Sequence, residues 1–187
     1  MVLYAVQYIN LLLRSDLTFN SVNINNLIMR NIFYSFQFKN DVMRVQQIRN
    51  IGTIVDNKPV SLSKWEELQA GGDSAIRRWI DSSIARASCV VVLIGSETHN
   101  SKWVRYEIEK AWNEGKGLVG VRIHNLSCPR TGKSAKGQNP FSKVTLKDGT
   151  NLSSKIEIYD PKNDTYNWIA NNIETVVEKG ISCRRKL

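Results

Sequence analysis

The amino-acid sequence predicts an α/β fold: a doubly wound, mainly parallel five-stranded sheet with helices on both faces. The first observation is the run from Cys89 to Ile94, which is continuously apolar and rich in valine. Such a run is typical of a central parallel strand that is buried on both faces. The second observation is that strand-like and helix-like segments alternate along the chain, which predicts parallel strands joined by helices.

The other elements follow from periodicity and turn residues. The predicted strands are residues 32–36, a short strand near 53–55, 89–94, 118–123 and 156–159, and the predicted helices are 41–50, 74–85, 101–113 and 166–177. In helix 74–85, Ile76, Ile80 and Ile84 recur on one face, as expected for a helix that covers a sheet. Between residues 55 and 74 we expect a long polar loop, with Asp73 as the N-cap of the next helix.

The two ends of the chain differ in composition from the predicted domain. Residues 1–28 are rich in asparagine and contain no glycine or proline. They are predicted to form an N-terminal extension, and two interpretations stay open: Met29 is the true start, or residues 4–13 form a helix that packs on the domain or on a partner. Residues 29–180 are predicted to form the domain, and residues 181–187 a basic C-terminal tail.

The composition indicates a globular protein without a membrane anchor. At 187 residues the chain can bury a proper core, and its apolar stretches are too short for a membrane-spanning helix. Its three cysteines lack the spacing of a zinc site, and their odd number does not fit a disulfide framework, so reduced thiols in a cytoplasmic protein are the simplest interpretation. The net charge of +9 favours anionic ligands, but no motif indicates specific binding to nucleic acid.

The segment from residue 89 to residue 112 is the most informative part of the chain for function. Gly95 and Ser96 end the apolar strand, and a helix follows in which Trp103 and Glu107 lie one turn apart on the same face. In an open α/β sheet ligands bind beside the carboxyl ends of the strands, so this carboxylate is expected to face the ligand crevice. The alternative is a surface acid paired with Arg105 or Lys110.

Motifs of several competing chemistries are missing. The sequence has no dinucleotide-binding G-x-G-x-x-G after a strand, no phosphate-binding Walker A loop and no G-x-S-x-G elbow. A phosphorylated receiver domain needs an acidic cluster at the end of the first strand, where Tyr34, Ser35 and Phe36 stand instead.

Four segments, RNIFYSF, VVLIGSETHNSKWVRYEIEKA, GKGLVGVRIHN and KGQNPF, occur in this order between residues 29 and 141. Together they resemble the TIR-like proteins of bacterial anti-phage defence, specifically the Thoeris ThsB family. The resemblance implies a flavodoxin-like, TIR-like fold in which Glu107 is the catalytic residue that cleaves the nicotinamide–ribose bond of NAD. It also implies that the segment between residues 55 and 74 gates the pocket or mediates assembly; the alternative is an ordinary surface connection with Trp65 packed onto the core.

Candidate substrate-binding residues are Ser35, Phe36, Trp103, His124 and Asn139. Aromatic side chains suit the walls of a nicotinamide pocket, and a single carboxylate can stabilise the cation that develops on the ribose. Structural alternatives stay open: Phe36 as a core residue, His124 as a structural or solvated residue, and Asn139 as the start of the turn at Pro140.

By resemblance, the protein is expected to convert NAD into a cyclic ADP-ribose-type signal when phage infection is sensed. The signal would activate a separate effector protein. NAD is then the substrate, and neither a resident cofactor nor a metal is expected; a homo-oligomer stays open. The alternative is a non-enzymatic TIR-like module that assembles with partners.

Overall fold

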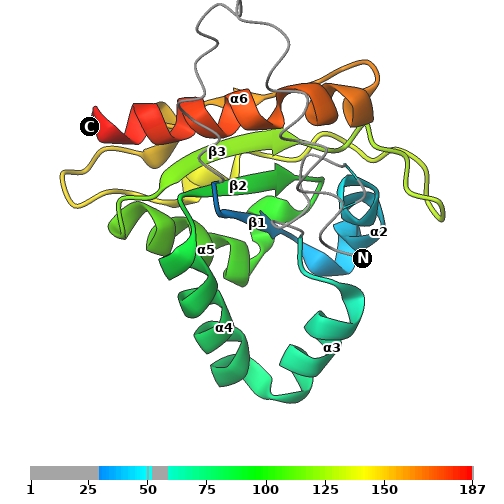
Figure 1. Ribbon diagram of the computed structural model, residues 1–187, viewed down its shortest axis with the longest axis horizontal. Coiled ribbons are helices and arrows are strands. Elements are labelled where there is room, and N and C mark those ends of the chain that lie inside the picture. The colour runs from blue at the N-terminus through cyan, green and yellow to red at the C-terminus, as the bar shows by residue number, and fades with distance from the viewer. Residues whose placement is uncertain (1–29, 50, 52–58, 187) are drawn as a thin grey trace, which may run out of the picture.

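The computed structural model describes residues 30–49, 51 and 59–186, and Figure 1 shows the arrangement of their elements. The strands are β1 (Ile32–Phe36), β2 (Cys89–Ile94), β3 (Gly117–Arg122) and β4 (Ile158–Tyr159). The helices are α2 (Phe38–Ile48), α3 (Leu62–Ala70), α4 (Gly72–Arg86), α5 (Lys102–Asn113) and α6 (Thr165–Arg185), with short 3-10 turns at Thr98–Asn100, Pro140–Lys143 and Leu152–Ser154. The N-terminal extension and the predicted strand near residues 53–55 lie outside the described residues.

The described sheet has the order β1-β2-β3-β4, and all its pairs are parallel. Strand β2 has the predicted bounds and lies between β1 and β3, with Ser35 opposite Val92 and Val92 opposite Gly120. Every residue of β2 is buried, as predicted for a central strand covered on both faces. The predicted α/β class is therefore confirmed, with four strands within the described part of the chain.

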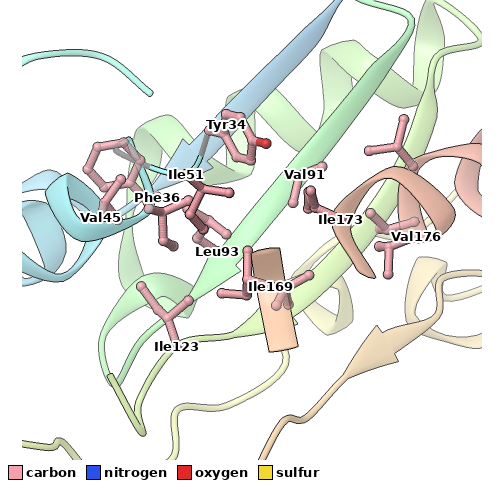
Figure 2. Packing of buried hydrophobic residues seen from close by; sticks show 14 of the residues in the cluster. Tyr34, Phe36, Val45, Ile51, Val91, Leu93, Ile123, Ile169, Ile173 and Val176 are labelled. Atoms are coloured by element: carbon pink, nitrogen blue, oxygen red, sulfur yellow. The ribbon is translucent and has the colours of Figure 1, made fainter. Parts of the chain in front are cut away.

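Helices cover both faces of the sheet and divide its core in two. In Figure 1, α6 lies on one side of the strands, and α4 and α5 lie on the other. Helices α2 and α6 share the first core, where Val45, Leu93 and Ile173 pack together (Figure 2). Helices α4 and α5 form the second core on the opposite face. Alternation along β1 thus points Tyr34 and Phe36 into the first core and Phe33 into the second.

Close approach of α6 to β3 depends on glycine. A Cβ atom on Gly180 would lie 2.5 Å from Cγ1 of Val119, and one on Gly117 would lie 2.9 Å from the backbone nitrogen of Ile181. Both positions therefore require the absence of a side chain, because real Cβ atoms do not approach other atoms so closely. Among the described residues, no helix is both long and apolar enough to cross a membrane.

Two sequence-based predictions about local structure are wrong, and the last helix is longer than predicted. The segment predicted to be a polar loop contains α3, which begins after Ser61, where the Ser61 hydroxyl accepts a hydrogen bond from the backbone N–H of Lys64. Asp73 is not the N-cap of α4, because Gly71 holds that position and Asp73 lies in the first turn. The predicted basic tail is helical, since α6 continues to Arg185.

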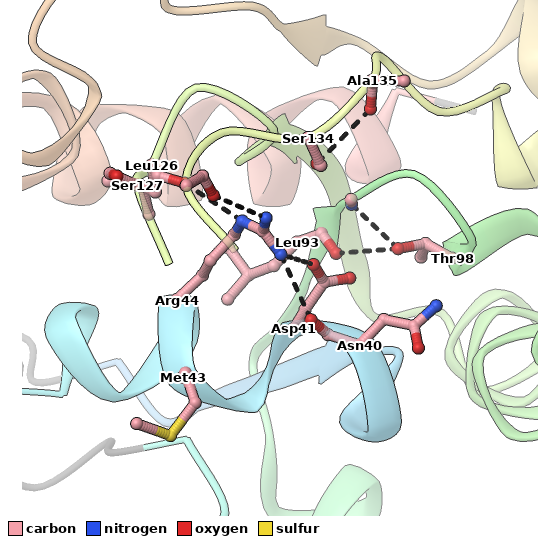
Figure 3. Close-up of polar contacts among 12 residues, drawn as sticks. Asn40, Asp41, Met43, Arg44, Leu93, Thr98, Leu126, Ser127, Ser134 and Ala135 are labelled. Atoms are coloured by element: carbon pink, nitrogen blue, oxygen red, sulfur yellow. Dashed lines mark hydrogen bonds and ion pairs between the residues drawn. The ribbon is translucent and has the colours of Figure 1, made fainter. Parts of the chain in front are cut away.

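A buried ion pair fixes α2 against the loop that follows β3 (Figure 3). The Arg44 guanidinium donates to Asp41 within α2 and to the backbone carbonyls of Leu126 and Gly132. Asp41 is fully buried, and its second carboxyl oxygen has no hydrogen-bond partner among the described residues. Burial raises the pKa of Asp41 to about 6, against the opposing effect of Arg44. This pair holds the beginning of α2 at the carboxyl edge of the sheet, beside the candidate site.

Candidate functional site

Helix α5 brings Glu107 into the core side of the sheet. Ser101 caps the helix, because its hydroxyl accepts a hydrogen bond from the backbone N–H of Val104. Val104, Ile108 and Ala111 form the apolar stripe of this helix and are fully buried. Glu107 is buried beside them, with 5% of its surface exposed, and its carboxylate accepts a hydrogen bond of 2.5 Å from the Ser35 hydroxyl of β1.

The alternative of a surface acid is wrong. Arg105 pairs with Glu109, and Lys110 pairs with Asp81 and Glu114, so neither cation pairs with Glu107. Within the described part of the chain, the side-chain hydrogen bond that Glu107 receives comes from Ser35. Burial raises the pKa of Glu107 from 4.5 to about 8, although the hydrogen bond from Ser35 acts in the opposite direction. A carboxyl group that lies in a cleft and has a pKa near neutral is typical of a site that performs acid or base chemistry.

Aromatic side chains enclose the space in front of Glu107. Trp79 contacts Phe33 with 5.5 Å between ring centroids, and Trp65 stacks on Phe38 at 4.9 Å. The walls of this aromatic cavity also include Glu107 itself: its lining residues are Phe33, Tyr34, Phe36, Gln37, Phe38, Val60, Trp65, Trp79, Ser101, Trp103 and Glu107. The cavity thus combines flat apolar walls with one carboxyl group.

In this structure the aromatic cavity is narrow. Its volume is about 20 Å³. That is room for about one water molecule. Binding of a ring-sized ligand in this cavity would therefore require some of the aromatic side chains to move, and the burial of Glu107 between these side chains explains why its charged form is disfavoured.

The structure brings some of the predicted site residues together and leaves others apart. Phe36 and Trp103 line the aromatic cavity with Glu107, and Ser35 contacts the Glu107 carboxylate directly. Phe36 also packs in the core on the α2 and α6 side, so it is a core residue as well, which was the structural alternative from the sequence.

His124 and Asn139 are not lining residues of the aromatic cavity. His124 follows β3, two strands from β1, and burial lowers its pKa while Asp160 acts in the opposite direction. The side-chain oxygen of Asn139 accepts a hydrogen bond from the backbone N–H of Phe141 and so caps the turn at Pro140. Their substrate-binding roles stay predictions.

Sequence reasoning missed Phe38 and Trp65 as parts of the site. Phe38 begins a helix whose start was placed three residues later, and Trp65 lies on the helix that was predicted to be a loop. A usable signal existed in the sequence for each: Phe38 lies two residues beyond the predicted end of β1, and Trp65 stands among polar residues, where a large aromatic side chain needs a partner to be buried. Across the described residues, no cluster of His, Cys, Asp and Glu side chains could hold a metal ion.

A parallel α/β domain with a glutamate on the helix after its central strand, facing a cavity at the carboxyl edge of the sheet, fits the TIR-like class of protein that the sequence resemblance implies. The chain matches the family model of the TIR-like domain of the Thoeris protein ThsB over residues 33–127, about half of its 187 residues. The chain therefore belongs to the Thoeris ThsB family, as the four sequence segments predicted. The matched region contains Ser35, Trp103, Glu107 and His124, whereas Asn139 lies beyond it.

A curated relative is similar over a larger part of the chain. It is a protein of Bacillus cereus (strain MSX-D12) with the name "Putative cyclic ADP-D-ribose synthase ThsB1". The two sequences are 32% identical over 117 residues, which cover 60% of this chain and 61% of the relative. The chain thus spans about three fifths of the length of this relative.

Proposed function

We propose that this protein cleaves NAD at the nicotinamide–ribose bond and closes the ADP-ribose part into a cyclic signal that activates an effector protein in anti-phage defence. The observation that carries the proposal is the buried Glu107 carboxyl group, held by Ser35 in a cavity with aromatic walls. Similarity to a relative named for cyclic ADP-ribose synthesis supports the same substrate and product class.

The chemistry requires little from the protein beyond this arrangement. When the bond between ribose C1′ and the nicotinamide nitrogen breaks, its electron pair moves to the nitrogen, and neutral nicotinamide leaves. Positive charge develops on the ribose, and the ionised Glu107 carboxylate stabilises it electrostatically. Aromatic walls such as Trp103 exclude water, so that the other end of the same substrate captures the cation with the advantage of high effective concentration.

The raised pKa of Glu107 constrains the mechanism. With a pKa of about 8, the carboxyl group is mostly protonated at pH 7 in the protein without substrate. The nicotinamide ring of NAD carries a positive charge, and a cation beside a carboxyl group favours its ionised form. Substrate binding therefore promotes ionisation of Glu107, and a nucleophilic hydroxyl group that captures the ribosyl cation can pass its proton to this carboxylate.

The small volume of the cavity favours a second candidate function, a non-enzymatic TIR-like module that acts through partner contacts. Space for about one water molecule beside Glu107 is what a buried structural acid would also have. The two functions differ in a simple observable, since the module does not consume NAD.

The deciding experiment incubates the full-length chain with NAD, with and without lysate of phage-infected cells, and measures nicotinamide and cyclic products by liquid chromatography and mass spectrometry. The wild-type chain should release nicotinamide in at least one condition. Glu107→Gln should lower the rate by about 10² to 10³, the typical cost of one preorganised electrostatic group. Glu109→Gln on the same helix is the matched control and should keep the wild-type rate. Wild-type nicotinamide release by Glu107→Gln would exclude this site.

A further inference from the structure

An outer groove adjoins the aromatic cavity at the carboxyl edge of the sheet. It is lined by Gln37, Phe38, Lys39, Trp65, Gln69, Gly72, Asp73, Ile76, Lys102 and Trp103. Gln37, Phe38, Trp65 and Trp103 line both spaces, so these side chains form the boundary between them. The outer groove has a volume of about 490 Å³, compared with about 20 Å³ for the cavity.

Cationic groups lie on the outer groove. Lys39 and Lys102 line it from the beginnings of α2 and α5, and Asp73 is the acidic residue among its lining residues. The Lys102 ammonium group lies 2.6 Å from the Asp73 carboxylate and 4.8 Å from the centroid of the Trp103 ring. Lys102 is the first residue of the 12-residue helix α5, whose N-terminus carries partial positive charge of its own. The groove therefore offers a ligand aromatic surface and positive charge together.

The ion pair between Lys102 and Asp73 is easily exchanged. The two side chains are 67% and 71% exposed, and ion pairs at such positions contribute little to stability. An incoming anion with more charge than one carboxylate can therefore displace Asp73 from Lys102.

A second groove also borders the cavity, but it fits an anion less well. It is lined by Phe33, Tyr34, Val60 and Trp79 of the cavity wall and by residues at the start of β1 and the end of α4, where Arg86 is its cationic residue. This groove lies toward the amino end of β1, whereas ligands of open α/β sheets bind at the carboxyl ends of the strands.

We propose that the outer groove binds the diphosphate of a dinucleotide whose nicotinamide ribose reaches Glu107, with Lys102 as the main cationic contact and Lys39 as the second. The inference rests on the proposed function, because it places the diphosphate relative to the ribose that is cleaved. Asp73 competes with the diphosphate for Lys102. Removal of the Lys102 charge should therefore weaken binding of the diphosphate, and removal of the Asp73 charge should strengthen it.

The test measures binding of ADP-ribose by isothermal titration calorimetry to full-length chains that carry Glu107→Gln, so that no turnover interferes. Lys102→Met should weaken binding about tenfold, the lower end for a hydrogen bond to a charged group. Asp73→Asn should tighten binding about threefold, in keeping with the small free energy of an exposed ion pair. Arg86→Met, in the second groove, is the control and should bind as the parent does.

A kinetic test adds a second readout. In the chain with native Glu107, Lys102→Met should raise KM for NAD and leave kcat within about twofold, because a diphosphate contact is the same in the ground state and the transition state. Thermal unfolding of each variant checks that it is folded, which the exposure of both side chains leads us to expect.

Each outcome decides one of the two proposals. Unchanged ADP-ribose binding by Lys102→Met, or weaker binding by Asp73→Asn, would overturn the groove assignment. Weaker binding by Arg86→Met alone would move the diphosphate to the second groove. A chain that cleaves no NAD but binds ADP-ribose with the expected pattern would refute the proposed function and keep the groove assignment. A chain that cleaves NAD, and whose Lys102→Met variant has a normal KM for NAD, would refute the groove assignment and keep the proposed function.

Discussion

Replacement of Glu107 by glutamine should make the folded protein more stable while it removes the proposed catalytic charge. Glutamine has nearly the shape of glutamic acid, and its amide oxygen can still accept the hydrogen bond from Ser35. The substitution removes an ionisable group from a position with 5% exposure. If Glu107 were a surface acid, which was the alternative from the sequence, the substitution would change the free energy of unfolding by no more than about 0.5 kcal/mol.

The expected gain follows from the difference between the two pKa values of Glu107, about 8 in the folded protein and 4.5 ordinarily. Between these pH values the folded chain keeps a proton that the unfolded chain has lost, so the free energy of unfolding falls as pH rises. The stabilising contribution is complete below about pH 4.5 and is lost by about pH 8. One pH unit corresponds to about 1.4 kcal/mol. At pH 7, about 2.5 units above 4.5, the wild type is therefore less stable than the glutamine variant by about 3 kcal/mol.

Urea unfolding at pH 5 and pH 8 measures this directly. The difference in free energy of unfolding between Glu107→Gln and the wild type should stay below about 1 kcal/mol at pH 5 and be much larger at pH 8. At pH 7 the melting temperature of the variant should be about 5 to 10 °C higher. Glu109→Gln is the control, since Glu109 lies on α5 in an exposed pair with Arg105 and should show no such pH dependence. A difference that is equal at both pH values would refute the argument, because it would mean an ordinary pKa for Glu107.

Three further predictions concern the same site and its support. First, kcat/KM for NAD cleavage should rise with pH and level off near pH 8, because the carboxylate form of Glu107 is the active one; a flat profile between about pH 6 and pH 9 would contradict this. Second, Ser35→Ala removes the hydrogen bond that lowers the pKa of Glu107, so the pH–rate profile should move to higher pH, whereas Ser35→Thr should keep it in place. Third, Arg44→Met leaves the buried Asp41 carboxylate without its partner and should lower the free energy of unfolding by about 3–5 kcal/mol, measured in urea against Arg49→Met, and a loss below about 1 kcal/mol would contradict it.

The sequence was sufficient for the parts of the fold that depend on continuous apolar runs. Strand β2 was predicted with its observed bounds, and its place between two parallel neighbours follows from burial on both faces. Helix α3 could not be predicted in this way, because Leu68 is its one buried residue and a single position gives no periodicity. Its N-terminal cap, Ser61, lacks the acidic partner three residues later that marks a capping box.

Part of the site was predictable for the same reason. The spacing of Trp103 and Glu107 placed both on one face of α5, and a helix that follows the central strand necessarily begins at the carboxyl edge of the sheet. Burial of Glu107 was not predictable, because it depends on Ser35 and on aromatic residues from α2, α3 and α4 that are distant in sequence. A position after the carboxyl end of a strand does not by itself place a residue in the site. His124 and Asn139 both follow β3, but neither lines the cavity.

The raised pKa of Glu107 and the narrow cavity have one physical cause, the close packing of side chains around the carboxyl group, which keeps water away from it. Under the proposed function, movement of an aromatic side chain such as Trp65 or Trp103 to admit a nicotinamide ring also brings the carboxyl group close to a positive charge, which favours ionisation. On that proposal, the event that widens the cavity also produces the charged form that stabilises the ribosyl cation. While the cavity is narrow the group is mostly neutral and a nicotinamide ring does not fit beside it, so we expect the resting protein to hold NAD cleavage low by geometry and by protonation together.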